Sequence, residues 1–225
     1  MSQIHESRLS DNRFIDRVWK SQNVSDGVYV STPDCSWDII VLIQPDGSRS
    51  VMLTGQAAEA AEVPYKGGTS SVVVSFAAGA YMPDYPGRRM LNLFEMLPND
   101  GPDHFILSGH RFAIPTFEAA EDLVTQMEQT GLLKMDDVVA AIIMGSPKAL
   151  SDRATQRHFL ETTGLTRKAL EQIKRAQAAV SQLQQGMRPA DVAADTGYTD
   201  QAHLSKSLQK IMRSRPSNVD DIHKL

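Results

Sequence analysis

The chain has 225 residues, of which 41% are hydrophobic and 22% charged, a composition typical of a globular protein rather than a disordered one. It has no run of about 18 apolar residues and no apolar N-terminal segment, so we expect a soluble cytoplasmic protein without a membrane partner. The only cysteine, Cys35, excludes an intrachain disulfide and a cysteine-based zinc site. We expect Cys35 to be an inert small hydrophobe rather than a redox-sensitive thiol.

The net charge of −4 is divided unevenly along the chain. Residues 1–135 carry 10 basic against 17 acidic residues, a balance of −7, whereas residues 136–225 carry 13 against 10, a balance of +3. Residues 145–219 alone reach +6, with 12 basic and 6 acidic residues. A locally basic half is compatible with a nucleic-acid partner, although charge asymmetry between domains is also common without one.

From about residue 26 to residue 114 the sequence favours β-structure. The apolar run SWDIIVLIQ (36–44) ends at a Pro-Asp-Gly turn (45–47), and SVMLTG (50–55) is the expected returning strand. Further strands are expected in TSSVVVSFA (69–77) and HFILSGHRFAI (104–114). This spacing predicts an antiparallel sandwich or small barrel, a sensor domain over residues 1–115.

After Pro115 the apolar residues recur every three to four positions, which predicts a helical connector over residues 116–135 with Gly131 near its end. No strand pattern follows, so the fold class is α+β with an all-helical region over residues 136–225. The acids at the start of MDDVVAAIIM (135–144) favour a helix N-terminus, and the next helix begins near Ser151 and ends before Gly164. A long amphipathic helix is expected over about 166–186.

A second pair of helices follows the long one. Pro189 suits a first helical turn, Gly197 a tight turn, and Asp200 the cap of a helix with Leu204 and Leu208 on its inner face. One such helix-turn-helix is a weak signal, because helical hairpins are common packing units. Two of them joined by a helix of about 30 Å match the ~34 Å turn of B-DNA, so one chain would reach two successive major grooves.

These residues resemble the AraC/XylS family of transcription regulators. LSDRATQRHFLETTGLT (150–166) is similar to its first recognition helix, IKRAQAAVSQL (173–183) to its linker helix, and DVAADTGYTDQAHLSKSLQKIMRSRP (191–216) to its second helix-turn-helix. The N-terminal WDII strand, PDG turn and later Leu-Pro segment resemble the cupin-like sensor of some members. The resemblance implies a sequence-specific DNA-binding regulator that is not an enzyme and has no cofactor.

The resemblance also implies which residues face DNA. These are Arg153, Gln156 and Arg157 in the first recognition helix and Gln201, Ala202, His203 and Lys206 in the second. Arginine can pair with guanine, glutamine with adenine, and an alanine methyl with thymine. Each charged residue has the ordinary alternative of a solvated surface group, and His203 that of a cap or packing residue.

The sequence departs from the family pattern at three places. Residues 145–149 lengthen the first turn, and Thr155 stands where an apolar residue usually faces the core. Arg213 stands where glycine normally ends the last helix, which costs stability if a positive φ is required there. We expect the first unit to be less sequence-selective than the second.

The N-terminal half carries weaker signals. His5, His104 and His110 are scattered, so no metal site is expected. An effector pocket is a hypothesis for the residues Trp37, Asp38, Phe76, Tyr81, Arg88 and Arg89, with aromatic core packing and ordinary surface charge as the alternatives.

The partners expected are double-stranded DNA and a small-molecule effector of unknown identity, with RNA polymerase and a second copy of the chain as further candidates. Two other functions stay open at this point. One is a cupin-like enzyme with a helical appendage, against which the lack of a nucleophile–base pair or a phosphate-binding loop counts. The other is a protein-interaction module.

Overall fold

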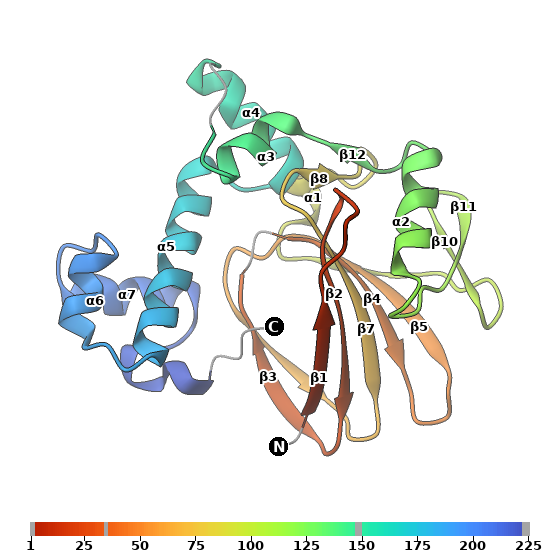
Figure 1. The fold of residues 1–225 in the computed structure, drawn as a ribbon, viewed down its shortest axis with the longest axis horizontal. Coiled ribbons are helices and arrows are strands. Elements are labelled where there is room, and N and C mark those ends of the chain that lie inside the picture. The colour runs from red at the N-terminus through yellow and green to blue at the C-terminus, as the bar shows by residue number, and fades with distance from the viewer. Residues whose placement is uncertain (1–2, 34–35, 147–149, 222–225) are drawn as a thin grey trace.

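The computed structural model of the chain describes residues 3–33, 36–146 and 150–221. A β-rich N-terminal region is followed by a helical region that lies to one side of it (Figure 1). This arrangement confirms the predicted class. Cys35 and residues 147–149 of the lengthened first turn lie outside the described residues. Within the described ranges, no helix combines the length and the apolar composition needed to cross a membrane.

The largest sheet has six antiparallel strands in the order β1-β2-β7-β4-β5-β9. Their bounds are β1 (Gln3–Arg8), β2 (Ile15–Asn23), β7 (Ser70–Phe76), β4 (Asp38–Ile43), β5 (Arg49–Thr54) and β9 (Phe94–Leu97). Because β1 and β9 are its edges, the sheet is open, and the predicted alternative of a closed barrel is wrong. Strands also begin well before residue 26, where the sequence predicted none. Polar residues such as Arg17 and Lys20 obscure the apolar pattern of β2, which is why that strand was not predicted.

Three two-stranded sheets complete the β-structure. They pair β3 (Gly27–Ser31) with β6 (Ala61–Tyr65), β10 (His104–Leu107) with β11 (His110–Ala113), and β8 (Ala80–Tyr81) with β12 (Lys134–Met135). Strand β12 comes just before the helical region, so its pairing with β8 anchors the start of that region on the N-terminal one.

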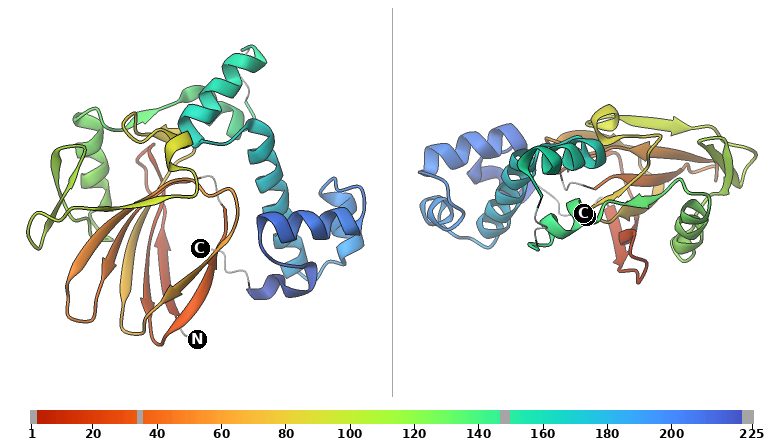
Figure 2. Two further views of the ribbon diagram at one scale, coloured as in Figure 1. Left: turned by 180° about the vertical axis from the view of Figure 1, so that it is seen from behind. Right: turned by 90° about the horizontal axis from the view of Figure 1, so that it is seen from above.

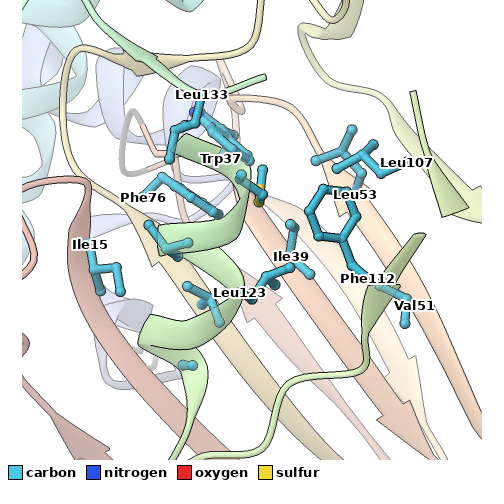
Figure 3. Close-up of a cluster of buried hydrophobic side chains, with 14 of the residues drawn as sticks. Ile15, Trp37, Ile39, Val51, Leu53, Phe76, Leu107, Phe112, Leu123 and Leu133 are labelled. Carbon is cyan, nitrogen blue, oxygen red and sulfur yellow. The ribbon is translucent and has the colours of Figure 1, made fainter. Parts of the chain in front are cut away.

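One face of the six-stranded sheet forms the N-terminal core. Strand side chains alternate between the two faces, and Ile39, Val51 and Leu53 are buried on the face shown in Figure 3. Helix α2 (Ala120–Gln129) contributes Leu123 and other apolar side chains to the same core. The predicted connector is therefore packed against the sheet instead of bridging two separate bodies.

Strand β1 is also tied to α2 by an ion pair. The Arg8 guanidinium donates to both carboxylate oxygens of Glu121, at 2.6 and 2.7 Å, and to the carbonyl oxygen of Phe117. The hydrogen bond from Arg8 lowers the pKa of Glu121 to about 2, so this carboxyl group stays ionised at neutral pH.

The helical region contains α3 (Asp137–Ile143), α4 (Asp152–Thr163), α5 (Arg167–Gln184), α6 (Pro189–Asp195), α7 (Gln201–Ile211) and the 3-10 helix η1 (Pro216–Asp221). A short helix in the N-terminal region, α1 (Gly87–Met90), packs against α4. Buried side chains from α3 to α7 form one shared core that includes Val139, Phe159, Ile173, Val192 and Leu208. The two predicted helix pairs are therefore parts of one packed unit.

The ends of α4 and α7 differ in a way that predicts a stability change. Gly164 ends α4 with a φ of 71°, whereas Arg213, just after α7, adopts a φ of 50°. A side chain strains the backbone at a positive φ of this size, so Arg213→Gly should raise the free energy of unfolding by about 0.5–1 kcal/mol. This figure already subtracts the cost of glycine's greater freedom in the unfolded chain. Urea denaturation measures this gain, and Arg215→Gly, at an exposed position without a positive φ, should show none. A loss in Arg213→Gly would mean that the exposed pair of Arg213 with Glu59 outweighs the strain.

Candidate nucleic-acid interface

Two helix-turn-helix units are joined by one long helix. Helices α3 and α4 form the first unit, α6 and α7 the second, and α5 connects them. Helix α5 has 18 residues and so is about 27 Å long. It packs against α6, α7 and η1 through a stripe of buried residues that includes Ala176 and Ala179, whose small side chains permit close approach. The long helix lies where the sequence predicts it.

The first recognition helix, α4, has one buried and one exposed face. Ser151 caps it by accepting a hydrogen bond from the backbone N–H of Ala154 at 3.3 Å. The buried face consists of Thr155, Phe159, Thr162 and Thr163. Arg153, Gln156 and Arg157 are all exposed. The structure thus brings these three residues together on a solvent-facing surface.

The second recognition helix, α7, is built in the same way. Asp200 caps it by accepting from the N–H of His203 at 2.7 Å. Leu204, Leu208 and Ile211 are buried against the shared core. The predicted contact residues are all exposed, namely Gln201, Ala202, His203 and Lys206.

The turn of the second unit is held by packing around Tyr198. Gly197 has a φ of 75°, and Tyr198 is only 4% exposed. Arg175 of α5 lies over the Tyr198 ring at 4.7 Å and donates to the carbonyl oxygen of Gly197 at 3.2 Å. His203 meets the ring edge-on at 5.2 Å, and its Nδ1 lies 3.2 Å from the Thr199 hydroxyl. His203 therefore packs at this corner while remaining exposed.

Counting from the caps shows which positions of the two recognition helices correspond. Arg157 is the sixth residue after Ser151, and Lys206 is the sixth after Asp200, so both units carry a cation at the centre of the outer face. Four positions later the units differ, with Glu161 in the first and Lys210 in the second.

An open groove of about 960 Å³ runs along α7. It is lined by two predicted residues, Gln201 and Lys206, and by Ser205, Gln209, Lys210 and Arg215, which the sequence analysis missed. Lys210 and Arg215 could have been found as exposed cations following the predicted contact residues in the same basic stretch.

The cations in the recognition helices, and Arg215 just after α7, are available for an anionic partner. Among the described residues, Arg153, Arg157, Lys206, Lys210 and Arg215 form no ion pair. Glu161 instead pairs with Arg88 of α1, so the last turns of α4 are directed to the N-terminal region. The exposed cations are a suitable surface for phosphates and for acceptors on base edges.

The residues of the predicted effector pocket do not all lie together. Trp37 and Phe76 are buried and stacked with ring centroids 3.7 Å apart, as labelled in Figure 3, and Trp37 donates to the carbonyl oxygen of Ala80. Asp38 lies on the opposite sheet face, because the next residue, Ile39, points into the core. Its neighbours across the strands are Ser75 of β7 and then Arg17 of β2.

Tyr81 and the two arginines lie nearer the helical region. Tyr81 and Trp37 both line a small cavity of about 10 Å³, which holds roughly one water molecule. Tyr81 and Arg88 both line a wider pocket of about 520 Å³ beside α3 and α4. Arg88 and Arg89 are exposed on α1. No single ligand-sized pocket formed by the described residues unites the six, and their role in effector binding stays a prediction.

Comparison with known proteins identifies the helical region. A family model described as a helix-turn-helix domain matches residues 148–221. No curated protein matches the chain. The match covers α4 to η1, which includes both recognition helices and the connecting helix.

Similar solved structures include several of ToxT from Vibrio cholerae. An apo ToxT variant is 11% identical, with 99% of this chain and 98% of that chain covered at a TM-score of 0.41. A second ToxT crystal form is 10% identical, with both chains covered completely at a TM-score of 0.37. A ToxT structure with bound unsaturated fatty acid is 12% identical, with 91% of this chain and 98% of that chain covered at a TM-score of 0.35. The family match is what the comparisons show for this chain: residues 148–221 form a helix-turn-helix domain.

Proposed function

We propose that this protein is a sequence-specific transcription regulator in which one chain reads two successive major-groove segments of DNA. The observation that carries the proposal is the pair of exposed faces on α4 and α7, each with a cation at its centre, attached to one shared core. In the helix-turn-helix mode the second helix of each unit enters the major groove, and its outward side chains contact bases and phosphates.

The experiment that tests this function is selection of bound sequences from a random duplex pool with the full-length protein. We expect an asymmetric site with two recognised segments about 10 base pairs apart, because each recognition helix would occupy one groove segment. Recovery of a single short segment would contradict reading by both helices. No enrichment, together with duplex binding that is insensitive to salt, would favour a protein-interaction module.

We also propose that the N-terminal region controls how the recognition helices are presented. Contacts from this region reach the last turns of both helices. Gln56 donates to the carbonyl oxygen of Thr162 at 3.4 Å, and the N–H of Ala60 donates to the carbonyl oxygen of Ile211 at 2.7 Å. These contacts lie away from the exposed N-terminal halves of α4 and α7, so DNA and the N-terminal region can hold the same helices at different ends.

The connecting helix supports the same proposal. Gln177, in the middle of α5, donates to the carbonyl oxygen of Pro33 at 2.7 Å. In the view from behind in Figure 2, α5 runs alongside the N-terminal region with the two units at its ends. A change in the N-terminal region would therefore be transmitted to both units through direct contacts, without a flexible linker.

A further inference from the structure

Asp136 lies where the N-terminal region, α3 and α4 meet. Its backbone N–H donates to the carbonyl oxygen of Gly79 at 2.8 Å, directly after the pairing of Met135 with Ala80. A Cβ added at Gly79 would lie 2.9 Å from the carbonyl oxygen of Asp136, so the two segments approach too closely for a side chain there. The position of Asp136 is thus fixed by the N-terminal region.

The carboxylate of Asp136 connects the two helices of the first unit. Its Oδ1 accepts from the backbone N–H groups of Val138 and Val139, at 3.0 and 3.1 Å, and so caps α3. Its Oδ2 contacts the Nδ1 of His158 at 2.7 Å and accepts from the Thr162 hydroxyl at 2.9 Å, both on α4. One side chain therefore holds the start of α3 together with the middle and the last turn of α4.

This carboxylate is well shielded from water. The Asp136 side chain is 10% exposed. Burial raises the pKa of Asp136, but the hydrogen bonds from His158, Val139 and Thr162 outweigh it, so that the pKa lies below its usual value. The group is ionised at neutral pH, and each bond that it accepts is charge-assisted.

The second unit has no corresponding connection among its described residues. Its first helix, α6, begins after Arg188 without a side-chain cap, and Asp200 caps only the recognition helix itself. The angle of that unit is set by apolar packing and by the Tyr198 turn. Within the described part of the chain, a largely buried ionised group joins the two helices of the first unit but not those of the second.

We propose that Asp136 is a positioning residue for DNA reading, because it sets the angle at which α4 presents Arg153 and Arg157. This inference rests on the proposed function and deepens it. Asp136 would couple the position of the N-terminal region to the strength with which the first unit binds DNA. Loss of this coupling should weaken binding at the first subsite and leave the second subsite unchanged.

The test uses full-length variants on the selected duplex. The first subsite is defined as the one whose footprint is lost in Arg157→Ala. Asp136→Ser keeps a residue that caps helices well but is too short to reach α4 as Asp136 does. We expect it to lose at least about tenfold in affinity, with the first footprint weakened and the second retained. Thr162→Val, which removes one bond at nearly constant volume, should act in the same direction with a smaller loss.

Asp200→Ala is the matched control, since it removes a recognition-helix cap in the other unit and should weaken the second footprint instead. Equal weakening of both footprints by Asp136→Ser and Thr162→Val, or no change in either, would overturn the proposal.

Amide hydrogen exchange of the free protein supplies a readout without DNA, in which Asp136→Ser should speed exchange in α4 and leave α7 unchanged. If the wild-type protein binds no duplex, but Asp136→Ser speeds hydrogen exchange in α4 and not in α7, the proposed function fails while the structural link through Asp136 stands. If Asp136→Ser binds the duplex normally and exchange in α4 is unchanged, the structural link is wrong while the proposed function stands.

Discussion

Replacing Arg157 and Lys206 together with alanine should weaken binding to the selected duplex by roughly a thousandfold, since each groove contact contributes about 1–3 kcal/mol. The two residues occupy corresponding positions at the centres of the exposed faces of α4 and α7. Among the described residues neither has an ion pair to lose, and both side chains are exposed, so the fold should be unaffected. Titration of labelled duplex by gel shift at several salt concentrations measures the loss, and any phosphate contact removed should lower the salt slope by about one.

The matched control for this double variant is Lys66→Ala with Arg111→Ala. This control also removes two positive charges, but from the N-terminal region, where Lys66 and Arg111 are paired at the surface with Asp26 and Asp100. We expect little change in duplex affinity. An equal loss in both double variants would show that net charge alone governs binding. No loss in either would mean that α4 and α7 do not contact DNA.

Gly164→Ala should lower the free energy of unfolding by about 3 kcal/mol, because it combines a left-handed backbone with overpacking. A Cβ at Gly164, where φ is 71°, would lie 2.4 Å from the carbonyl oxygen of Gly87 in α1. Gly131 is the matched control, since it has a φ of 75° and no atom within 4 Å of an added Cβ. Gly131→Ala should cost only about 1 kcal/mol, from the backbone term alone. Urea denaturation of both variants gives the difference.

The same contact can be tested from its other side. A Cβ at Gly87 would lie 2.3 Å from the backbone nitrogen of Gly164, although Gly87 does not have a positive φ. Gly87→Ala should therefore be destabilising through the contact alone, and its cost and that of Gly164→Ala should not be additive. If the N-terminal region positions α4 as proposed, Gly87→Ala should also alter the first footprint. Equal costs for Gly164→Ala and Gly131→Ala would contradict a close contact between α1 and α4 in solution.

The helical region was predictable because its signals are local. Ser151 and Asp200 cap helices through bonds to residues three positions away, and Gly164 ends α4 with the positive φ expected of it. The exposed and buried faces of α4 and α7 follow from the helical period. Even the strain at Arg213 was visible, since the position requires a conformation that glycine adopts easily.

The N-terminal region was less predictable because its contacts join distant segments. Trp37 and Asp38 are neighbours in sequence, but strand register places Asp38 on the sheet face opposite to the core that contains Trp37, and that separation could not be predicted from sequence order. Strands β1 and β2 contain many polar residues, and they are identified as strands by the pairing of β2 with β7, about 50 residues later, and of β1 with β2.

By itself the sequence determined two helix-turn-helix units, the helix between them and the residues on their outer faces, because hydrogen bonds and apolar periods within a few positions decide those features. Only the tertiary structure decided how the first unit is held. The carboxylate of Asp136 reaches His158, 22 residues away, and Gly87 touches Gly164 across two regions of the chain. Such contacts depend on how whole elements pack, and that packing leaves no pattern in the order of the residues.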